Sequence, residues 1–286
     1  MKTKEINLIW QTQNGDQTTF EYDYTTEILF CDFNQNKIFD NGSLTTVLDN
    51  SVIIYSNNQS DVSEEFRNYL KKFVELNFNF YLLHFSNEGL SHNTNYYELA
   101  NHVFRNYYDK NILQKNVTFI PLGVKSGFLN NSDKIENKIW DFAFIGQPKS
   151  DRNELLEVIS NLDNVFTHKT NSWNCSTSLT QDECKLVYQK TKFVPCPMGW
   201  VHPDSFRIME CLESNSIPIL KSYNDIDYFL KVWGDSPIPI ISSWNELMSF
   251  YQMSDEEYNK LHSEVFSWYQ NFKRSLKNKI NDKIQQ

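Results

Sequence analysis

A loop and the helix that follows it, in the second half of the chain, combine residue types that could bind phosphate. The loop holds Pro197 and Gly199, and the helix, which Asp204 or Ser205 can cap, carries Arg207 in its first turn. The start of a helix beside a glycine loop, at the carboxyl end of a parallel strand, favours anions. An arginine there adds a planar set of donors suited to phosphate. The alternative to a phosphate site is an ordinary βαβ unit.

A second glycine turn precedes this segment in the chain. Residues 138–145 are predicted to form a strand that ends at Gly146, and Lys149 and Arg152 follow it. Backbone N–H groups after Gly146 and the charge of Arg152 could hold a diphosphate, although a plain turn with two solvated cations would look the same. Both loops follow strands, so we expect them at one edge of a parallel sheet, where they would form one pocket.

The elements that position these residues alternate between strands and helices. We expect strands at 6–10, 27–31, 51–55, 78–85, 117–121, 138–145, 165–168, 192–196 and 217–220. We expect helices at 61–74, 95–108, 151–161, 180–189, 205–213, 224–232, 244–251 and 254–277. The polar segment 129–137 is the best candidate for a linker. Two halves with βα alternation predict two open parallel sheets.

The order and spacing of these motifs resemble the exostosin-like glycosyltransferases, family 47 and its bacterial relatives. The shared pieces are Pro197-x-Gly199, Ser205-x-Arg207-x-x-Glu210 and Ile217-Pro218-Ile219. Asn215-Ser216 stands where the family often has glycine, and because Asn tolerates left-handed backbone we expect the turn to be kept. In the first half the likeness continues with His84-x-Ser86-Asn87-Glu88 and Ile120-Pro121-Leu122-Gly123, so it covers roughly residues 80–220.

This resemblance implies an α/β protein of the GT-B type, in which two Rossmann-like domains face an interdomain cleft. Residues 1–128 would form the acceptor-side domain and 129–255 the domain that binds the nucleotide sugar. Residues 256–286 would form a helix that packs back toward the first domain.

The resemblance also implies roles for single residues. The donor would be bound by Gly146, Lys149, Arg152, Pro197, Gly199, His202, Ser205, Arg207 and Glu210. Glu210 would accept hydrogen bonds from the ribose, with Glu213 as a competing carboxylate. The structural alternative for Glu210 is an ion pair with Arg207 one turn away. A lone loop histidine such as His202 could instead simply be exposed.

An inverting transfer needs a base that takes the proton of the acceptor hydroxyl. Glu88 is the first candidate, because it follows the most apolar strand of the first half. His84 is the second, and His92 a lesser one. The family often has Asp where this chain has Asn87, which removes one possible base. Alternatively, Glu88 caps the next element or pairs with Arg105.

A divalent metal is not expected. The one Asp-x-Asp sequence, Asp225-Ile226-Asp227, lies on an expected helix and is interpreted as charge at its N-terminus. The mechanism would then be metal-independent, with no cofactor and with a UDP-sugar as the expected co-substrate. The acceptor would be a glycan or lipid-linked glycan such as capsule or lipopolysaccharide, and a lipid-linked acceptor would bring peripheral contact with a membrane.

Composition limits the remaining classes. The formal net charge of −9 over 286 residues argues against a nucleic-acid partner, which would need a basic surface. Five cysteines, an odd number with no zinc-binding spacing, indicate reduced thiols. The sequence contains no apolar signal run and no transmembrane segment, so we expect a cytoplasmic protein.

Two other functions fit the same residues. The chain could be a catalytically inactive glycan- or nucleotide-binding protein of the same fold, an interpretation that Asn87 supports. A sugar-phosphate epimerase of GT-B shape would need a different set of carboxylates.

Overall fold

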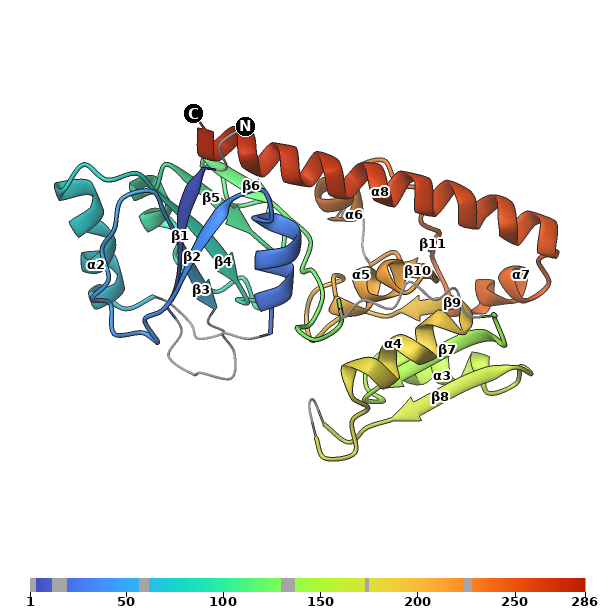
Figure 1. The fold of residues 1–286 in the computed structure, drawn as a ribbon. Helices are drawn as coiled ribbons and strands as arrows, with labels where there is room; N and C mark the ends of the chain where they lie inside the picture. The colour runs from blue at the N-terminus through green and yellow to red at the C-terminus, as the bar shows by residue number, and fades with distance from the viewer. Residues whose placement is uncertain are drawn as a thin grey trace. The chain divides into compact units, whose positions relative to one another are not determined.

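The chain forms two compact units, each built on its own parallel sheet (Figure 1). The computed structural model describes residues 4–11, 20–56, 62–129, 137–172, 175–223 and 228–285. The first unit comprises Met1–Leu122, Lys231–Trp233 and Lys273–Gln286, and the second comprises Gly123–Leu230 and Gly234–Phe272. The expected linker at 129–137 lies almost entirely outside the described residues.

The sheet of the first unit has six parallel strands in the order β2-β1-β3-β4-β5-β6. In chain order these are β1 (Glu5–Gln11), β2 (Asn34–Phe39), β3 (Ser51–Ser56), β4 (Phe80–Phe85), β5 (His102–Arg105) and β6 (Val117–Phe119). Every residue of β3 and β4 is buried, which is typical of central parallel strands covered on both faces. The edge strand β2 is largely exposed, and polar residues such as Lys37 protect its free edge.

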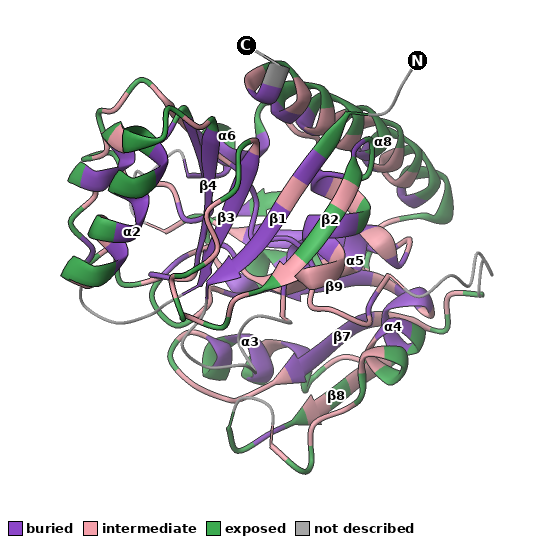
Figure 2. Ribbon diagram, turned by 60° about the vertical axis from the view of Figure 1, so that its left-hand side comes forward, coloured by how far each residue is buried: buried purple, intermediate pink, exposed green. Residues whose placement is uncertain are grey.

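Helix α2 (Glu64–Glu75) shows how local sequence builds this unit. The Ser63 hydroxyl accepts a hydrogen bond from the Phe66 N–H over 3.2 Å and so caps the helix. Its buried side chains, including Phe66, Leu70 and Phe73, lie on one face and belong to the core of the unit, while the other face is exposed (Figure 2). The first unit also contains the π-helix η1 (Tyr24–Leu29) and the 3₁₀ helix η2 (Asn95–Leu99).

Two of the expected elements in this unit are wrong. Residues 27–31 lie on and after η1 and form no strand. The helix expected at 95–108 is replaced by η2 and strand β5, whose four residues are all buried and pair with β4. The Asn101 side chain accepts a hydrogen bond from the Phe80 N–H over 2.8 Å at the start of this pairing.

The second unit has a five-stranded parallel sheet in the order β11-β10-β9-β7-β8. Its strands are β7 (Trp140–Gly146), β8 (Val165–Lys169), β9 (Thr191–Cys196), β10 (Ile217–Lys221) and β11 (Ile240–Ile241). The helices of this half are α3 (Arg152–Ile159), α4 (Gln181–Gln189), α5 (Phe206–Glu213), α6 (Tyr228–Trp233), η3 (Trp244–Glu246), α7 (Leu247–Tyr251) and α8 (Asp255–Gln285). The two sheets confirm the α/β class with two Rossmann-like domains.

The loop–helix–strand segment folds as its sequence predicts. β9, α5 and β10 follow one another, and Asn215 between α5 and β10 has φ +59°, so it keeps the left-handed turn without a glycine. Cys196 and Cys211 are buried, and all five cysteines are free. The long helix α8 contributes to both units, because the first unit contains Lys273–Gln286.

Candidate functional site

The carboxyl ends of β7 and β9 are adjacent at the point where the strand order of the second sheet reverses. The chain runs from β7 outward to β8 and then returns to the other side of β7 to form β9. In open α/β sheets, ligands bind beyond the carboxyl ends of the strands at this switch point. Gly146 ends β7, and the loop with Pro197 and Gly199 follows β9. Topology therefore brings both glycine loops to the position where a ligand is expected.

Arg207, in the first turn of α5, reaches across to β7. Its Nη2 donates a hydrogen bond to the Ile145 carbonyl oxygen over 2.8 Å, and its guanidinium carbon lies 5.6 Å from the centre of the Phe144 ring. The Nε of Arg207 is buried and has no hydrogen-bond partner among the described residues. A buried, unused donor on a half-buried cation favours an anionic ligand.

Glu210 lies one turn after Arg207. No Arg207–Glu210 contact within 4.0 Å occurs in the part of the chain that the structure describes, so the simple helix ion pair is not formed. Burial raises the pKa of Glu210 to about 7, against the opposing charges of Arg207 and Lys125. The competing carboxylate, Glu213, instead accepts a hydrogen bond from Tyr269 over 2.6 Å.

The N-terminus of α5 has a second unused group. Ser205 is the N-cap residue, but its side chain makes no capping hydrogen bond. Its Oγ is buried and has no partner within the described ranges. The hydroxyl of Ser205 and the Nε of Arg207 therefore both remain available at the start of one helix, next to the switch point.

Gly146 lets two arginine side chains lie close to the backbone. It has φ +145°, a conformation that side chains disfavour. A Cβ at this position would lie 3.2 Å from Nη2 of Arg207 and 3.9 Å from Nη1 of Arg152. The close approach of cation and backbone thus depends on the missing side chain.

Arg152 joins the two glycine loops. Its Nη2 donates to the carbonyl oxygens of Met198 (2.7 Å) and Gly199 (3.3 Å), and its Nη1 donates to that of Gln147 (3.3 Å). The side chain is 9% exposed. Arg152 is thus placed to hold the loops, whereas the sequence suggested direct contact with the donor.

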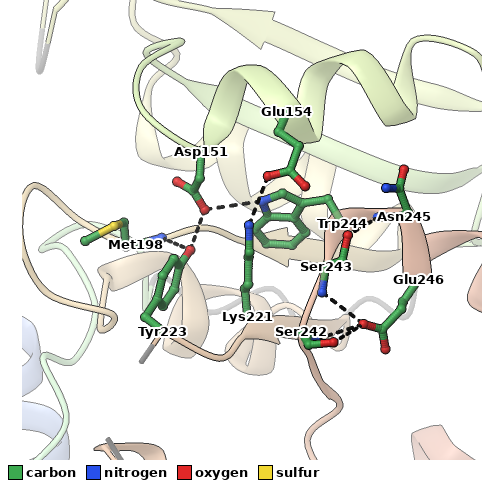
Figure 3. A network of polar contacts seen from close by, with 10 residues as sticks. All are labelled: Asp151, Glu154, Met198, Lys221, Tyr223, Ser242, Ser243, Trp244, Asn245 and Glu246. Atoms are coloured by element: carbon green, nitrogen blue, oxygen red, sulfur yellow. Dashed lines mark hydrogen bonds and ion pairs between the residues drawn. The ribbon is translucent and has the colours of Figure 1, made fainter. Parts of the chain in front are cut away.

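A network that the sequence did not predict holds the Met198 loop from the other side (Figure 3). The Met198 N–H donates to the Tyr223 hydroxyl over 2.9 Å, and this hydroxyl donates to Oδ2 of Asp151 over 2.5 Å. The same oxygen accepts from Trp244 Nε1 over 3.2 Å. Tyr223 lies just after β10 and Asp151 lies just before α3. Their positions at the ends of these elements were the feature of the sequence that could have indicated this network.

The remaining residues predicted near the donor have different environments. The Lys149 ammonium lies 4.0 Å from the centre of the Trp200 ring, and Pro197 is buried. His202 is 6% exposed, with its ring centre 4.6 Å from that of Tyr228. The interpretation of His202 as a merely exposed residue is therefore wrong.

In the first unit, Glu88 belongs to a strained loop that follows β4. Ser86 and Asn87 have φ values of +64° and +55°, and Leu90 has +52°. Such backbone conformations cost free energy and are found preferentially at functional sites. The Ser86 hydroxyl lies 2.8 Å from that of Ser56 at the end of β3, and Glu88 itself is half-buried.

His84 lies in the interior, in a cluster of polar rings. Its Nδ1 contacts the Tyr97 hydroxyl and lies 3.1 Å from Nη1 of Arg105, while its Nε2 lies 3.2 Å from Nδ1 of His92. Burial, with Arg105 and His92 adding to it, holds the pKa of His84 well below its ordinary value. Because the arginine can only donate, Nδ1 of His84 accepts, and the ring is neutral with its proton on Nε2. Arg105 is thus directed at His84 and Tyr97.

The described part of the chain has no group of three His, Cys, Asp or Glu residues that could hold a metal ion. The Asp225-Ile226-Asp227 sequence lies outside the described residues. Among the helices that the structure describes, none is both long enough and apolar enough to cross a membrane.

Several solved structures are similar to this chain. An α1,3-fucosyltransferase aligns with a TM-score of 0.49 at 12% identity, over 96% of this chain and 91% of its own. A UDP-glucosyltransferase from Polygonum tinctorium, capable of glucosylating indoxyl, aligns with 0.48 at 9% identity over 100% of both chains. TarM aligns with 0.45 at 13% identity, over 83% of this chain and 55% of its own. At these values the likeness says nothing about substrates.

Comparison of the sequence with curated proteins and family models identifies the family of the chain. No curated protein is significantly similar to the chain. Residues 129–286, however, match the model of the RXYLT1 C-terminal domain, and this match covers the strands, loops and helix of the switch-point site. The chain belongs to the RXYLT1 C-terminal domain family, which is related to glycosyltransferases.

Proposed function

We propose that the protein is an inverting, metal-independent glycosyltransferase that moves a sugar from a nucleotide sugar to a glycan or glycoconjugate acceptor. The observation that carries the proposal is Arg207, a half-buried cation at the switch point whose buried Nε has no partner among the described residues. A diphosphate would satisfy both its charge and this donor. The family membership supports the reaction class.

The donor would bind to the second unit. Arg207, the Ser205 hydroxyl and the N-terminus of α5 would face the diphosphate, with the backbone at Gly146 close by. As the sugar leaves, negative charge grows on the diphosphate, and the charge of Arg207 with the fixed hydrogen-bond donors of the site stabilises it. Arg152 would act by holding the loops, and Glu210 would accept hydrogen bonds from the ribose.

The acceptor would be activated by a residue of the first unit. Its hydroxyl oxygen forms a bond to the anomeric carbon while the bond from that carbon to the phosphate oxygen breaks. Glu88 takes the hydroxyl proton, and the nucleoside diphosphate leaves with the bonding electron pair. Attack on the face opposite the leaving group inverts the anomeric configuration. The burial of His84 makes Glu88 the better of the two candidates.

Finer details of the proposal come from the resemblance of the motifs. It favours an exostosin-like enzyme that uses a UDP-sugar and takes part in polysaccharide biosynthesis in the cytoplasm. The acceptor would be a capsule, lipopolysaccharide or lipid-linked glycan, and a lipid-linked acceptor would require peripheral contact with a membrane.

A panel of nucleotide sugars tests the reaction. The protein is incubated with each sugar donor, with and without a mixture of glycan acceptors, and release of nucleoside diphosphate and anomeric configuration are followed by NMR. Release from one donor that speeds up with acceptor, with inverted product, is expected. Conversion of the donor to its epimer without acceptor would contradict the proposal.

A catalytically inactive binding protein is the second candidate. Asn87 stands where the exostosin pattern often has Asp, and His84 is buried and neutral. Tight binding of UDP with no hydrolysis or transfer from any donor would favour this candidate over the enzyme.

A further inference from the structure

Trp200 is the most exposed tryptophan described, next to the proposed phosphate site. Its side chain is 72% exposed, and the adjoining Val201 is 51% exposed. Other tryptophans such as Trp10, Trp233 and Trp244 are at most 1% exposed. A large indole that stays in water loses the free energy that its burial would contribute. A ring that the fold leaves on the surface therefore indicates a function.

A cation holds the indole at a fixed place. The Lys149 ammonium lies 4.0 Å from the ring centre, well within the range of a cation–π contact. Lys149 follows β7 and Trp200 follows β9, so this contact joins the two loops of the switch point. Lys149 covers one face of the ring, and the high exposure of Trp200 leaves the rest of the indole open to a ligand.

The backbone before Trp200 is held on both sides. Met198 donates its N–H to the Tyr223 hydroxyl (Figure 3). Its carbonyl oxygen accepts a hydrogen bond from Arg152. The Gly199 N–H donates to the His202 carbonyl oxygen over 2.7 Å. The loop is therefore fixed before any ligand arrives, and binding to the ring would not have to order it.

We infer that Trp200 is a stacking surface for the nucleobase of the donor. This inference rests on the proposed function, because it extends the diphosphate site to the other end of the nucleotide. A nucleotide joins an anion to a flat aromatic base, and this edge of the sheet offers a half-buried cation with an open aromatic ring on an adjoining loop. Stacking on an aromatic side chain suits any base, since every base has a π face.

Calorimetry with UDP and inorganic pyrophosphate separates the base from the phosphates. In Trp200→Leu, the Kd of UDP should rise on the order of tenfold, while the Kd of pyrophosphate stays unchanged. Trp200→Phe keeps a flat ring and should retain most of the UDP affinity. Val201→Ala, a neighbouring exposed apolar position, is the matched control and should bind both ligands as the wild type does.

Three results would overturn the assignment. UDP binding that Trp200→Leu leaves unchanged would show that the ring does not contact the nucleobase. Equal weakening of UDP and pyrophosphate would make Trp200 part of the loop that shapes the phosphate site. Weakening confined to UDP-glucose, with UDP unaffected, would place the ring against the sugar. If the wild type binds neither UDP nor pyrophosphate, the proposed function itself fails, which is distinct from the other outcomes.

Discussion

Arg207 on α5 donates a hydrogen bond from Nη2 to the carbonyl oxygen of Ile145 on β7 over 2.8 Å. This contact joins a helix that follows β9 to the adjacent strand at the switch point. It uses one end of the guanidinium and leaves Nε without a partner among the described residues. The Arg207 side chain is therefore fixed in place and still has a donor that a ligand could use. The effects expected from replacing Arg207 and Gly146 depend on this geometry.

Replacing Arg207 tests the charge. In Arg207→Ala, the Kd for UDP and for pyrophosphate should rise by about 10²-fold or more, because a buried charge-assisted contact contributes roughly 3 kcal/mol. Calorimetry measures this, and circular dichroism should show an unchanged fold. Arg274→Ala, on the exposed surface of α8, is the control and should bind normally. Unchanged affinity with a lower melting temperature would show that Arg207 has a purely structural role.

Gly146 should not tolerate a side chain. Gly146→Ala places a Cβ 3.2 Å from Arg207 Nη2 and imposes φ +145° on an alanine. We expect a loss of about 1–3 kcal/mol in the free energy of unfolding and weaker UDP binding, because the arginine must move. Urea unfolding measures the first effect. Gly89→Ala is the control, since nothing lies within 4 Å of its Cβ position. Equal losses in both variants would count against a role for the close approach.

The elements that carry the candidate site residues could be predicted from sequence better than those of the first unit. Gly146 lies at the end of β7, before α3, and Arg207 and Glu210 lie on α5 after β9, and the local signals of both segments agree with the fold. Strand β5 could not be predicted this way, because the apolar residues of 95–108 also fit a helical period. Pairing with β4 and β6 makes His102–Arg105 a strand. Strand β2 is polar because it lies at an edge, so its sequence lacks the usual pattern.

Contacts between segments that are far apart in the chain also could not be predicted from the sequence. Tyr223 and Asp151 are 72 positions apart, and nothing local signals that they meet under the Met198 loop. The contacts of Arg152 could not be predicted for the same reason. A cation after a glycine turn suggests phosphate, but the fold brings the carbonyl oxygens of Met198 and Gly199 to it first.

Glu210 should make stability depend on pH. Burial raises its pKa from 4.5 to about 7, so between these values the folded protein holds a proton that the unfolded chain releases. Stability from this group is therefore full below pH 4.5 and falls as the pH rises to 7, by about 3 kcal/mol in total. In Glu210→Gln this fall should disappear. Urea unfolding at pH 5 and pH 8 measures it, with the exposed Glu264→Gln as control. A wild type and Glu210→Gln with the same pH profile would show that Glu210 does not titrate in this range.

Chelation should leave activity intact. Arg207 and the N-terminus of α5 can meet the charge of the leaving diphosphate, which is the task of a metal in other transferases. Turnover with and without EDTA, measured on the donor found by the panel, should agree within about twofold. Loss of activity with EDTA and its recovery with Mn²⁺ would refute a metal-independent mechanism and direct attention to Asp225 and Asp227.

Glu88 should be the general base. It follows β4, a fully buried strand of the first sheet, and comes directly after two residues with positive φ. Glu88→Gln keeps shape and hydrogen bonding but cannot take the proton, so kcat should fall by about 10²–10⁴-fold while the Kd for UDP holds. Glu98→Gln, a carboxylate on η2 of the same unit, is the control. Near-normal turnover in Glu88→Gln would move the search to His92. A His84→Gln variant addresses the buried ring separately, because His84 is buried and its Nε2 lies 3.2 Å from Nδ1 of His92.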